Sequence, residues 1–399
     1  MNTRRLATHS AFAIAGAVVG AVSVLAVSSW GRPAQMTREP RGVPGSDPPM
    51  ASAPVELDAD AVVLAWAPGG LPARAQEVAA ATRGVRSTTV VRAGLDWIVS
   101  ARAPDGSLLD RPPRGYRIPF EVGVVKPPQY ARFVPASERD AIRSLQRGQV
   151  LLARTSAQLR GATVGARIKL IDRTVRVSGI VSDVATNGYE ALVSGPPPPS
   201  WKRVDDFMLL EADRDARARI DRRLRALLEP GRRLRTRVGG EQPFLRYGDA
   251  VHPQMTIKER FGEFAARPQP DGSLEIDPRW RADNIRSRRV PLLGIVTCHR
   301  ALLPQLQSAL GEIRRKGLGH LVESYGGCYG PRFISRDPNG RLSHHAWGIA
   351  VDINPGSNPF GAEPNLPPRI VTIMESHGFT WGGRWLLPDG MHFEWSVFP

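Results

Sequence analysis

Two histidines and one aspartate near the C-terminus have the types and the spacing of metal ligands. Apolar and polar residues alternate over 349–353, so Asp352 and Ala350 lie on the same face of a predicted strand. A buried carboxylate without a partner is strongly unfavourable, and Asp352 therefore requires a cation. His345 lies at the start of the same strand, seven residues before Asp352. Histidine and aspartate are both ligand types that zinc accepts.

A third candidate ligand lies in the sequence DGMHFEW at residues 389–395. Residues 388–390 predict a turn, after which His392 and Glu394 lie on one face of a second strand. Two histidines and one aspartate leave one position of a tetrahedral zinc open for water, which is typical of a catalytic site. Asp389, on the turn before His392, can act as the base for that water. Glu394 is either a partner of a ligand or a solvated strand residue, and both interpretations stay open.

The motif S-x-H-x-x-G-x-A-x-D followed by D-x-x-H resembles that of the zinc D-alanyl-D-alanine carboxypeptidases and L-alanyl-D-glutamate endopeptidases, the VanY-like cell-wall peptidases. Its first part is met at Ser343, His345, Gly348, Ala350 and Asp352. The resemblance covers about 291–399 and leaves the first two thirds of the chain unexplained.

The resemblance implies a role for each matching residue. His345, Asp352 and His392 would bind Zn²⁺, and Asp389 would be the catalytic base. An aspartate at the base position favours the endopeptidase branch. The sequence Trp381-Gly382-Gly383 before the last motif favours the same branch.

Three further roles follow from the same comparison. Arg332, in the sequence ESYGGCYGPRF, is the candidate that stabilises the developing oxyanion. Ser343 and Trp381 are the candidates for substrate binding.

Other histidines in the last third of the chain lack motif support. His344 does not fit the ligand spacing and is interpreted as polar surface. His299, His320 and His377 are interpreted as surface or core histidines.

The composition bounds what the rest of the chain can do. The 399 residues are 23% charged and 42% hydrophobic, which is typical of a folded protein rather than a disordered one. The net charge of +16 comes almost entirely from arginine. Either an anionic partner or codon composition explains this excess. Because the arginines are dispersed and form no strip with aromatic residues, we expect no nucleic-acid partner.

Changes in composition divide the chain into four expected parts. Residues 1–30 predict a signal or membrane anchor, with an apolar run free of charge over 11–27. Residues 31–55 predict a proline-rich linker. Residues 56–239 predict an α+β extracytoplasmic domain of unknown role, and 240–399 predict a zinc peptidase domain with a small antiparallel sheet. The whole chain is thus expected to be α+β and to act in the cell envelope.

The middle part shows strand and hairpin patterns without a cluster of His, Cys and carboxylates. Residues 61–66 predict a strand and 168–181 a hairpin. The stretch 150–181 weakly resembles the extracytoplasmic domains of some membrane permeases. This part is a spacer, a docking module for an envelope protein, or a structural domain without a partner.

The chain has two cysteines, Cys298 and Cys328, and the predicted export exposes them to an oxidising compartment. We therefore expect a disulfide between them. Two unrelated buried thiols are the alternative, because sequence alone does not show how close their Cα atoms lie.

Together these patterns predict a zinc metallopeptidase that hydrolyses an amide bond in peptidoglycan stem peptides, of D,D-carboxypeptidase or L-Ala-D-Glu endopeptidase type. The first alternative is a catalytically weak module of the same fold that binds wall peptide or an envelope protein. The second is a scaffold whose important part is the middle domain.

Overall fold

The computed structural model describes residues 61–202, 204–241, 244–250 and 252–398. All of these residues belong to one compact unit. The predicted membrane segment at 1–30 and the predicted linker at 31–55 lie outside the described residues. Among the helices that the structure describes, none has the length and hydropathy needed to cross a bilayer. The expected α+β class is confirmed, including a small antiparallel sheet near the C-terminus.

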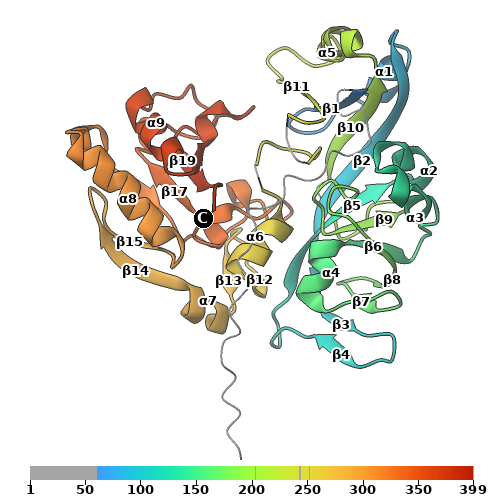
Figure 1. Cartoon of the computed structure of the whole chain (residues 1–399), viewed down its shortest axis with the longest axis horizontal. Helices are drawn as coiled ribbons and strands as arrows, with labels where there is room; N and C mark the ends of the chain where they lie inside the picture. Colours follow the sequence, from blue (N-terminus) through green and yellow to red (C-terminus); the bar gives the residue numbers. More distant parts are fainter. Residues whose placement is uncertain (1–60, 203, 242–243, 251, 399) are drawn as a thin grey trace, which may run out of the picture. The chain divides into compact units, whose positions relative to one another are not determined.

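An eleven-stranded sheet occupies most of residues 61–238 (Figure 1). Its strands, in spatial order, are β11 (Arg235–Val238), β1 (Val62–Trp66), β10 (Asp205–Ala212), β2 (Val85–Ile98), β5 (Ile118–Val125), β9 (Ala191–Ser194), β6 (Gln149–Ala153), β8 (Thr174–Val181), β7 (Arg167–Lys169), β3 (Ser100–Arg102) and β4 (Leu108–Asp110). The predicted strand at 61–66 is confirmed as β1, and the predicted hairpin at 168–181 as β7 and β8. The pairs β5–β9 and β6–β8 are parallel, and the other pairs are antiparallel.

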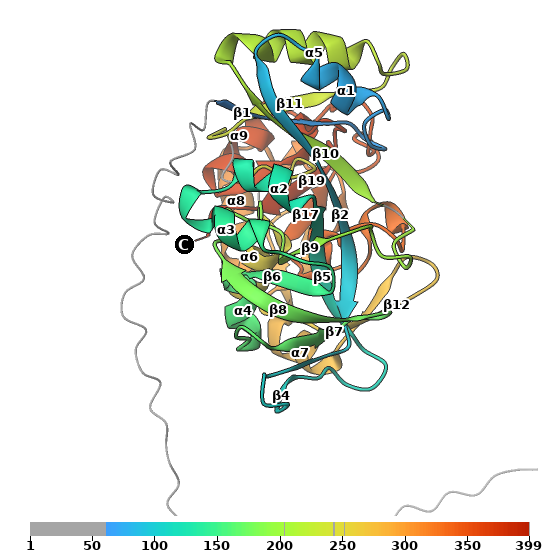
Figure 2. The ribbon, with the colours of Figure 1, turned by 90° about the vertical axis from the view of Figure 1, so that its right-hand side faces the viewer.

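The central strands of this sheet are buried on both faces. Every residue of β1 and β5 is buried, as expected for strands covered on both sides. Five short helices accompany the sheet: α1 (Ala75–Ala80), α2 (Pro127–Tyr130), α3 (Arg139–Arg143), α4 (Arg154–Arg160) and α5 (Arg217–Arg225). Figure 2 shows α1 and α5 near β1 and β11, and α2 and α3 near β5 and β9. In α5, Ile220 and Leu224 are buried, so one turn of the helix supplies the apolar contact that holds it in place.

Three small sheets and four helices form the remaining part. The sheets are β12 (Ala266–Pro268) with β13 (Leu274–Ile276), β14 (Ile285–Val290) with β15 (Gly294–His299), and the four-stranded sheet of β16 (Tyr325–Gly327), β17 (Ala350–Ile353), β19 (His392–Trp395) and β18 (Phe379–Trp381). The helices are α6 (Gln254–Phe261), α7 (Pro278–Asn284), α8 (Leu302–Arg315) and α9 (Pro368–Ser376).

Helix α8 shows how this part builds its core. Its apolar residues recur with helical spacing, and Leu302, Leu306, Leu310 and Ile313 are buried on one face. That face contacts α9 and the strands β14 and β15. The same core continues through β17 and β19, so the four-stranded sheet rests on a packed apolar layer.

A buried cluster of charges connects α4, α6 and the eleven-stranded sheet. Lys258 Nζ lies 2.8 Å from a carboxylate oxygen of Glu190, and Arg160 lies 2.9 Å from the other oxygen of that carboxylate. Glu263 accepts from both cations, at 2.7 Å from Arg160 and 2.8 Å from Lys258. Two positive and two negative side chains therefore balance inside the protein, as buried charges must.

Candidate metal centre and its pocket

The register of two neighbouring strands places two of the three candidate ligands, Asp352 and His392, side by side. Asp352 of β17 lies directly opposite His392 of β19, and Val351 lies opposite Phe393. Because side chains alternate along a strand, Asp352 and His392 share one face while Val351 and Phe393 point into the core. The structure thus confirms the alternation predicted from the sequence.

A short 3-10 turn brings the remaining candidate ligand, His345, to that face. His345 lies in η7 (His344–Ala346). Its own backbone N–H donates to the Oγ of Ser343, which caps this turn. Gly348 then allows the chain to turn into β17, because its φ of 70° is rarely adopted by residues with a side chain. A Cβ at this position would also lie only 2.7 Å from the backbone N of His299. The glycine of the motif is therefore a packing requirement.

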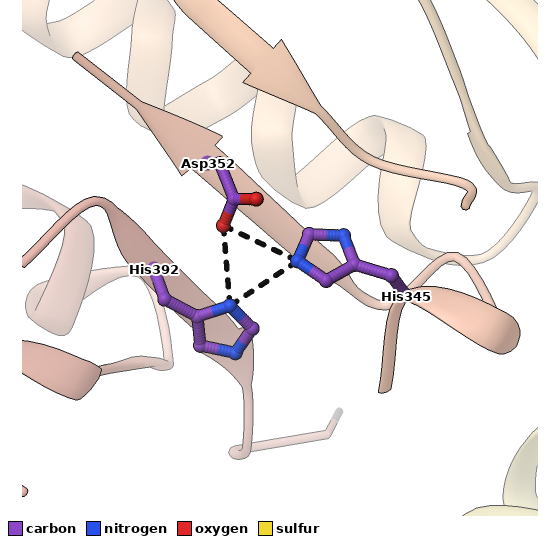
Figure 3. A group of neighbouring side chains, drawn as sticks. All are labelled: His345, Asp352 and His392. Carbon is purple, nitrogen blue, oxygen red and sulfur yellow. Dashed lines mark hydrogen bonds and ion pairs between the residues drawn. The ribbon is translucent and has the colours of Figure 1, made fainter. Parts of the chain in front are cut away.

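The ligand atoms of the three residues form a nearly equilateral triangle (Figure 3). His345 Nε2 to Asp352 Oδ1, His392 Nδ1 to Asp352 Oδ1, and His345 Nε2 to His392 Nδ1 are each 3.2 Å apart. Tetrahedral zinc at ligand distances of about 2.0–2.1 Å requires ligand atoms about 3.3 Å apart. All three side chains are buried. Among the residues that the structure describes, they form a group of three potential ligands whose ligand atoms lie close enough to share one metal ion.

A hydrogen bond to His345 and an ion pair with His392 outside the triangle orient the two imidazole rings toward its centre. His345 Nδ1 lies 2.7 Å from the carbonyl oxygen of Cys328. A carbonyl only accepts, so Nδ1 carries the proton and Nε2 presents its lone pair to the centre. His392 Nε2 faces Glu394 at 3.8 Å, which favours the proton there and leaves Nδ1 as the ligand atom. Glu394 also accepts from His344 Nδ1 at 2.8 Å, so it is a partner of histidines rather than a solvated residue.

The electrostatics of the triangle also fit a cation. Burial opposes ionisation of Asp352, but hydrogen bonds from His345 and His392 hold the pKa of its carboxyl below the usual range. Burial lowers the pKa of His345. Burial also disfavours the charged form of His392, yet hydrogen bonds to Asp352 and Glu394 raise its pKa to about 10. A metal at this position would compete with protons for the same ligand atoms.

Asp389 offers a half-buried carboxylate beside this centre, and it lines the same pocket as His345 and His392. Its backbone N–H donates to Gly382 O at 2.9 Å, and its own carbonyl accepts from His392 N at 3.1 Å. A Cβ on Gly382 would lie 2.8 Å from Asp389 O, so this close approach requires glycine. Within the described residues, Asp389 Oδ1 is buried without a hydrogen-bond partner. Burial raises the pKa of this carboxyl, as expected for a group that exchanges a proton.

Of the remaining predicted site residues, Arg332 and Ser343 line the pocket and Trp381 does not. Arg332 lies 3.9 Å from Asp352 Oδ2, and 30% of its side chain is exposed. Ser343 lines the same pocket and caps the turn that carries His345. Trp381 is absent from the lining of this pocket. It lies opposite Phe393 in β18, which puts it on the core side, and its Nε1 donates to Gly390 O at 2.8 Å.

Cys298 and Cys328 form the predicted disulfide, with their Cα atoms 5.4 Å apart. Cys328 also supplies the carbonyl that orients His345. The disulfide therefore fixes a backbone group that contacts a candidate ligand.

His299, His320 and His377 lie outside the triangle, in agreement with the interpretation from the sequence. The interpretation of His344 as polar surface is wrong, because its side chain is 13% exposed and its Nδ1 lies 2.8 Å from Glu394. His299 packs against Phe261 in the core, and burial lowers its pKa to about 4. His320 is exposed, and His377 pairs with Glu312 at 2.8 Å.

A cavity of about 460 Å³ opens over the candidate metal centre. This volume is within the range of pockets that hold small ligands. His345, His392, Asp389 and Arg332 line this cavity. The lining also includes residues that the sequence did not point to: Trp66, Glu121, Asp205, Tyr247 and Arg341. Three of these five belong to the eleven-stranded sheet, so the middle part of the chain helps to enclose the site.

Comparisons with known proteins give a low structural similarity and a match to a family model. A crystal structure of the periplasmic region of MacB from Actinobacillus actinomycetemcomitans is similar to 45% of this chain and to 90% of that chain, with 12% sequence identity and a TM-score of 0.30. The chain matches no curated protein. Residues 336–395 match a family model described as D-alanyl-D-alanine carboxypeptidase. The match includes all three members of the triangle and Asp389, and it supports a peptidase of this type in the C-terminal part.

Proposed function

We propose that the protein is a zinc-dependent peptidase that hydrolyses an amide bond in peptidoglycan stem peptides at the cell envelope. One observation supports this most: three ligand atoms of buried side chains lie 3.2 Å apart beside Asp389, within the segment that matches the carboxypeptidase family, and the Oδ1 of Asp389 is buried without a hydrogen-bond partner among the described residues. A site that only stores a metal needs no such carboxylate.

Each residue then has a task in hydrolysis. His345, Asp352 and His392 would hold the zinc, which polarises a carbonyl and lowers the pKa of water to about 7. Asp389 accepts the proton of the attacking water and returns it to the leaving amine. Arg332 donates to the oxygen of the attacked carbonyl, where negative charge develops.

Glu394 and His344 position the site without touching substrate atoms. Glu394 is buried, and hydrogen bonds and charge from His344 and His392 outweigh the effect of burial and lower the pKa of its carboxyl. The carboxylate then fixes the ring of His392 from behind, as is common for metal-bound histidines.

Turnover of defined muropeptides tests the proposal. The full chain is incubated with zinc and with stem peptides that end in D-alanyl-D-alanine or contain the L-alanyl-D-glutamate bond, and the products are weighed by mass spectrometry. Release of D-alanine identifies a D,D-carboxypeptidase, and cleavage after L-alanine identifies an endopeptidase. Tight binding of either peptide without cleavage would instead favour the alternative, a recognition module.

A further inference from the structure

Two arginines point into the pocket from one short antiparallel ribbon. Phe333 and Leu342 pair across this ribbon, and both side chains are buried in the core. Their neighbours along each strand must point the opposite way because side chains alternate. The four neighbours all line the pocket: Arg332, Ile334, Arg341 and Ser343.

The register of the ribbon fixes the spacing of these two arginines. Ser343 N donates to Arg332 O at 3.1 Å, and Ile334 N donates to Arg341 O at 2.8 Å. Arg332 and Arg341 are therefore diagonal neighbours, which lie about 7–8 Å apart in an antiparallel pair. Arg332 is the end of the ribbon near the candidate metal centre. Arg341 lies one step along the ribbon from that end, beside Asp205 and Tyr247.

Arg341 is held in place by residues outside the matched segment. Its Nε lies 3.1 Å from Asp205 Oδ2, on strand β10 of the large sheet. Its guanidinium lies over the ring of Tyr247, 5.2 Å from the centroid, and one terminal nitrogen donates to Tyr247 O at 3.4 Å. A guanidinium has five N–H donors, more than these contacts use. The side chain keeps 24% of its surface exposed, so it is oriented and accessible at once.

We propose that Arg341 binds a free carboxylate on the residue that follows the scissile amide, and thereby selects the substrate. The inference rests on the proposed function, because it assumes that the attacked carbonyl lies between the zinc and Arg332. One residue spans about 3.5 Å, so a carboxylate on the next residue lies within reach of the diagonal neighbour. An arginine fork also matches the geometry of a carboxylate.

Both candidate bonds carry such a carboxylate. In a peptide ending in D-alanyl-D-alanine it is the C-terminal carboxylate. In the L-alanyl-D-glutamate bond it is the α-carboxylate of a glutamate that continues through its side chain. Asp205 then gives the large sheet a role in specificity, because it orients the arginine that recognises this group.

Matched acid and amide substrates test the inference. For the bond that the wild-type protein cleaves, kcat/KM is measured on the peptide with the free carboxylate and on the same peptide with that group amidated. Charge-assisted hydrogen bonds predict a wild-type preference for the acid of about 10- to 100-fold. Arg341→Ala should reduce the ratio to about 1, and Arg341→Lys should give an intermediate ratio. The ratio does not depend on the fraction of folded protein.

A control and a second measurement separate the possible failures. Arg336→Ala removes an exposed arginine from the same hairpin that does not line the pocket, and the ratio should not change. Calorimetric titration of the Asp389→Asn protein with both peptides reads affinity without turnover, and adding Arg341→Ala should abolish the preference for the acid. An unchanged ratio in Arg341→Ala, with both peptides still cleaved, overturns the inference alone. No cleavage by the zinc-loaded wild type overturns the proposed function and this inference with it.

Discussion

Two buried polar clusters in this protein differ in how their charges are balanced. Around Glu190, two cations meet two carboxylates within 2.7–2.9 Å, and the protein supplies both signs. Around Asp352, two imidazole lone pairs and a carboxylate converge at 3.2 Å, and Asp389 adds a buried oxygen that has no hydrogen-bond partner among the described residues.

The difference distinguishes a structural cluster from a site that needs a ligand. The cluster at Glu190 is complete and joins α4 and α6 to the large sheet. The cluster at Asp352 gathers acceptors around one point, and Arg332 approaches Asp352 at 3.9 Å, so the converging lone pairs suit a proton or a metal ion. Changes in the first should therefore affect stability, and changes in the second should affect metal content and rate.

The largest effect is expected at Asp389. Replacing it with Asn keeps the size of the side chain but removes the base, and such a loss typically costs about 10²–10⁴ in rate. Zinc content should remain unchanged, because Asp389 is not one of the three ligands. Steady-state kinetics and metal analysis of the same sample check both statements. Glu363→Gln, at an exposed carboxyl in the same segment, is the control and should keep full activity.

Lys258→Ala should lower the free energy of unfolding by about 3–5 kcal/mol, because it leaves the buried carboxylates with one cation fewer. Lys316 is a matched control: it pairs with Glu312 at 2.8 Å, but 57% of its side chain is exposed. Lys316→Ala should cost about 1 kcal/mol or less. Chemical denaturation measures both. Equal effects for the two lysines would contradict the assignment of a structural role to the cluster at Glu190.

Near neutral pH, we expect a change of pH to alter the rate less than the substitutions above alter activity or stability. The base acts when it is ionised, and burial raises the pKa of Asp389. Activity should therefore rise with pH through that raised pKa and fall at lower pH. Bound zinc must be measured at each pH, since protonation of the histidines also releases metal in acid. In Asp389→Asn this acid limb should disappear wherever zinc stays bound.

The sequence predicted that His345, Asp352 and His392 come together, because local rules place these residues. Alternation along 349–353 and 392–395 decides which side chains share a face, and the motif supplies their types. Trp381 shows the limit of spacing: the register with Phe393 turns it toward the core, and no motif encodes that register. Arg341 was missed because its role depends on Asp205, which is distant in the sequence and reaches the pocket only through the order of strands in the large sheet.

Metal analysis of the purified full chain tests the central claim most directly. We expect about one zinc per chain in the wild type and a strong loss in His392→Ala, since three protein ligands are the usual minimum for a catalytic zinc. His320→Ala, which removes an exposed histidine outside the triangle, should retain the metal. Equal zinc content in the wild type and in His392→Ala would contradict the assignment of the metal centre.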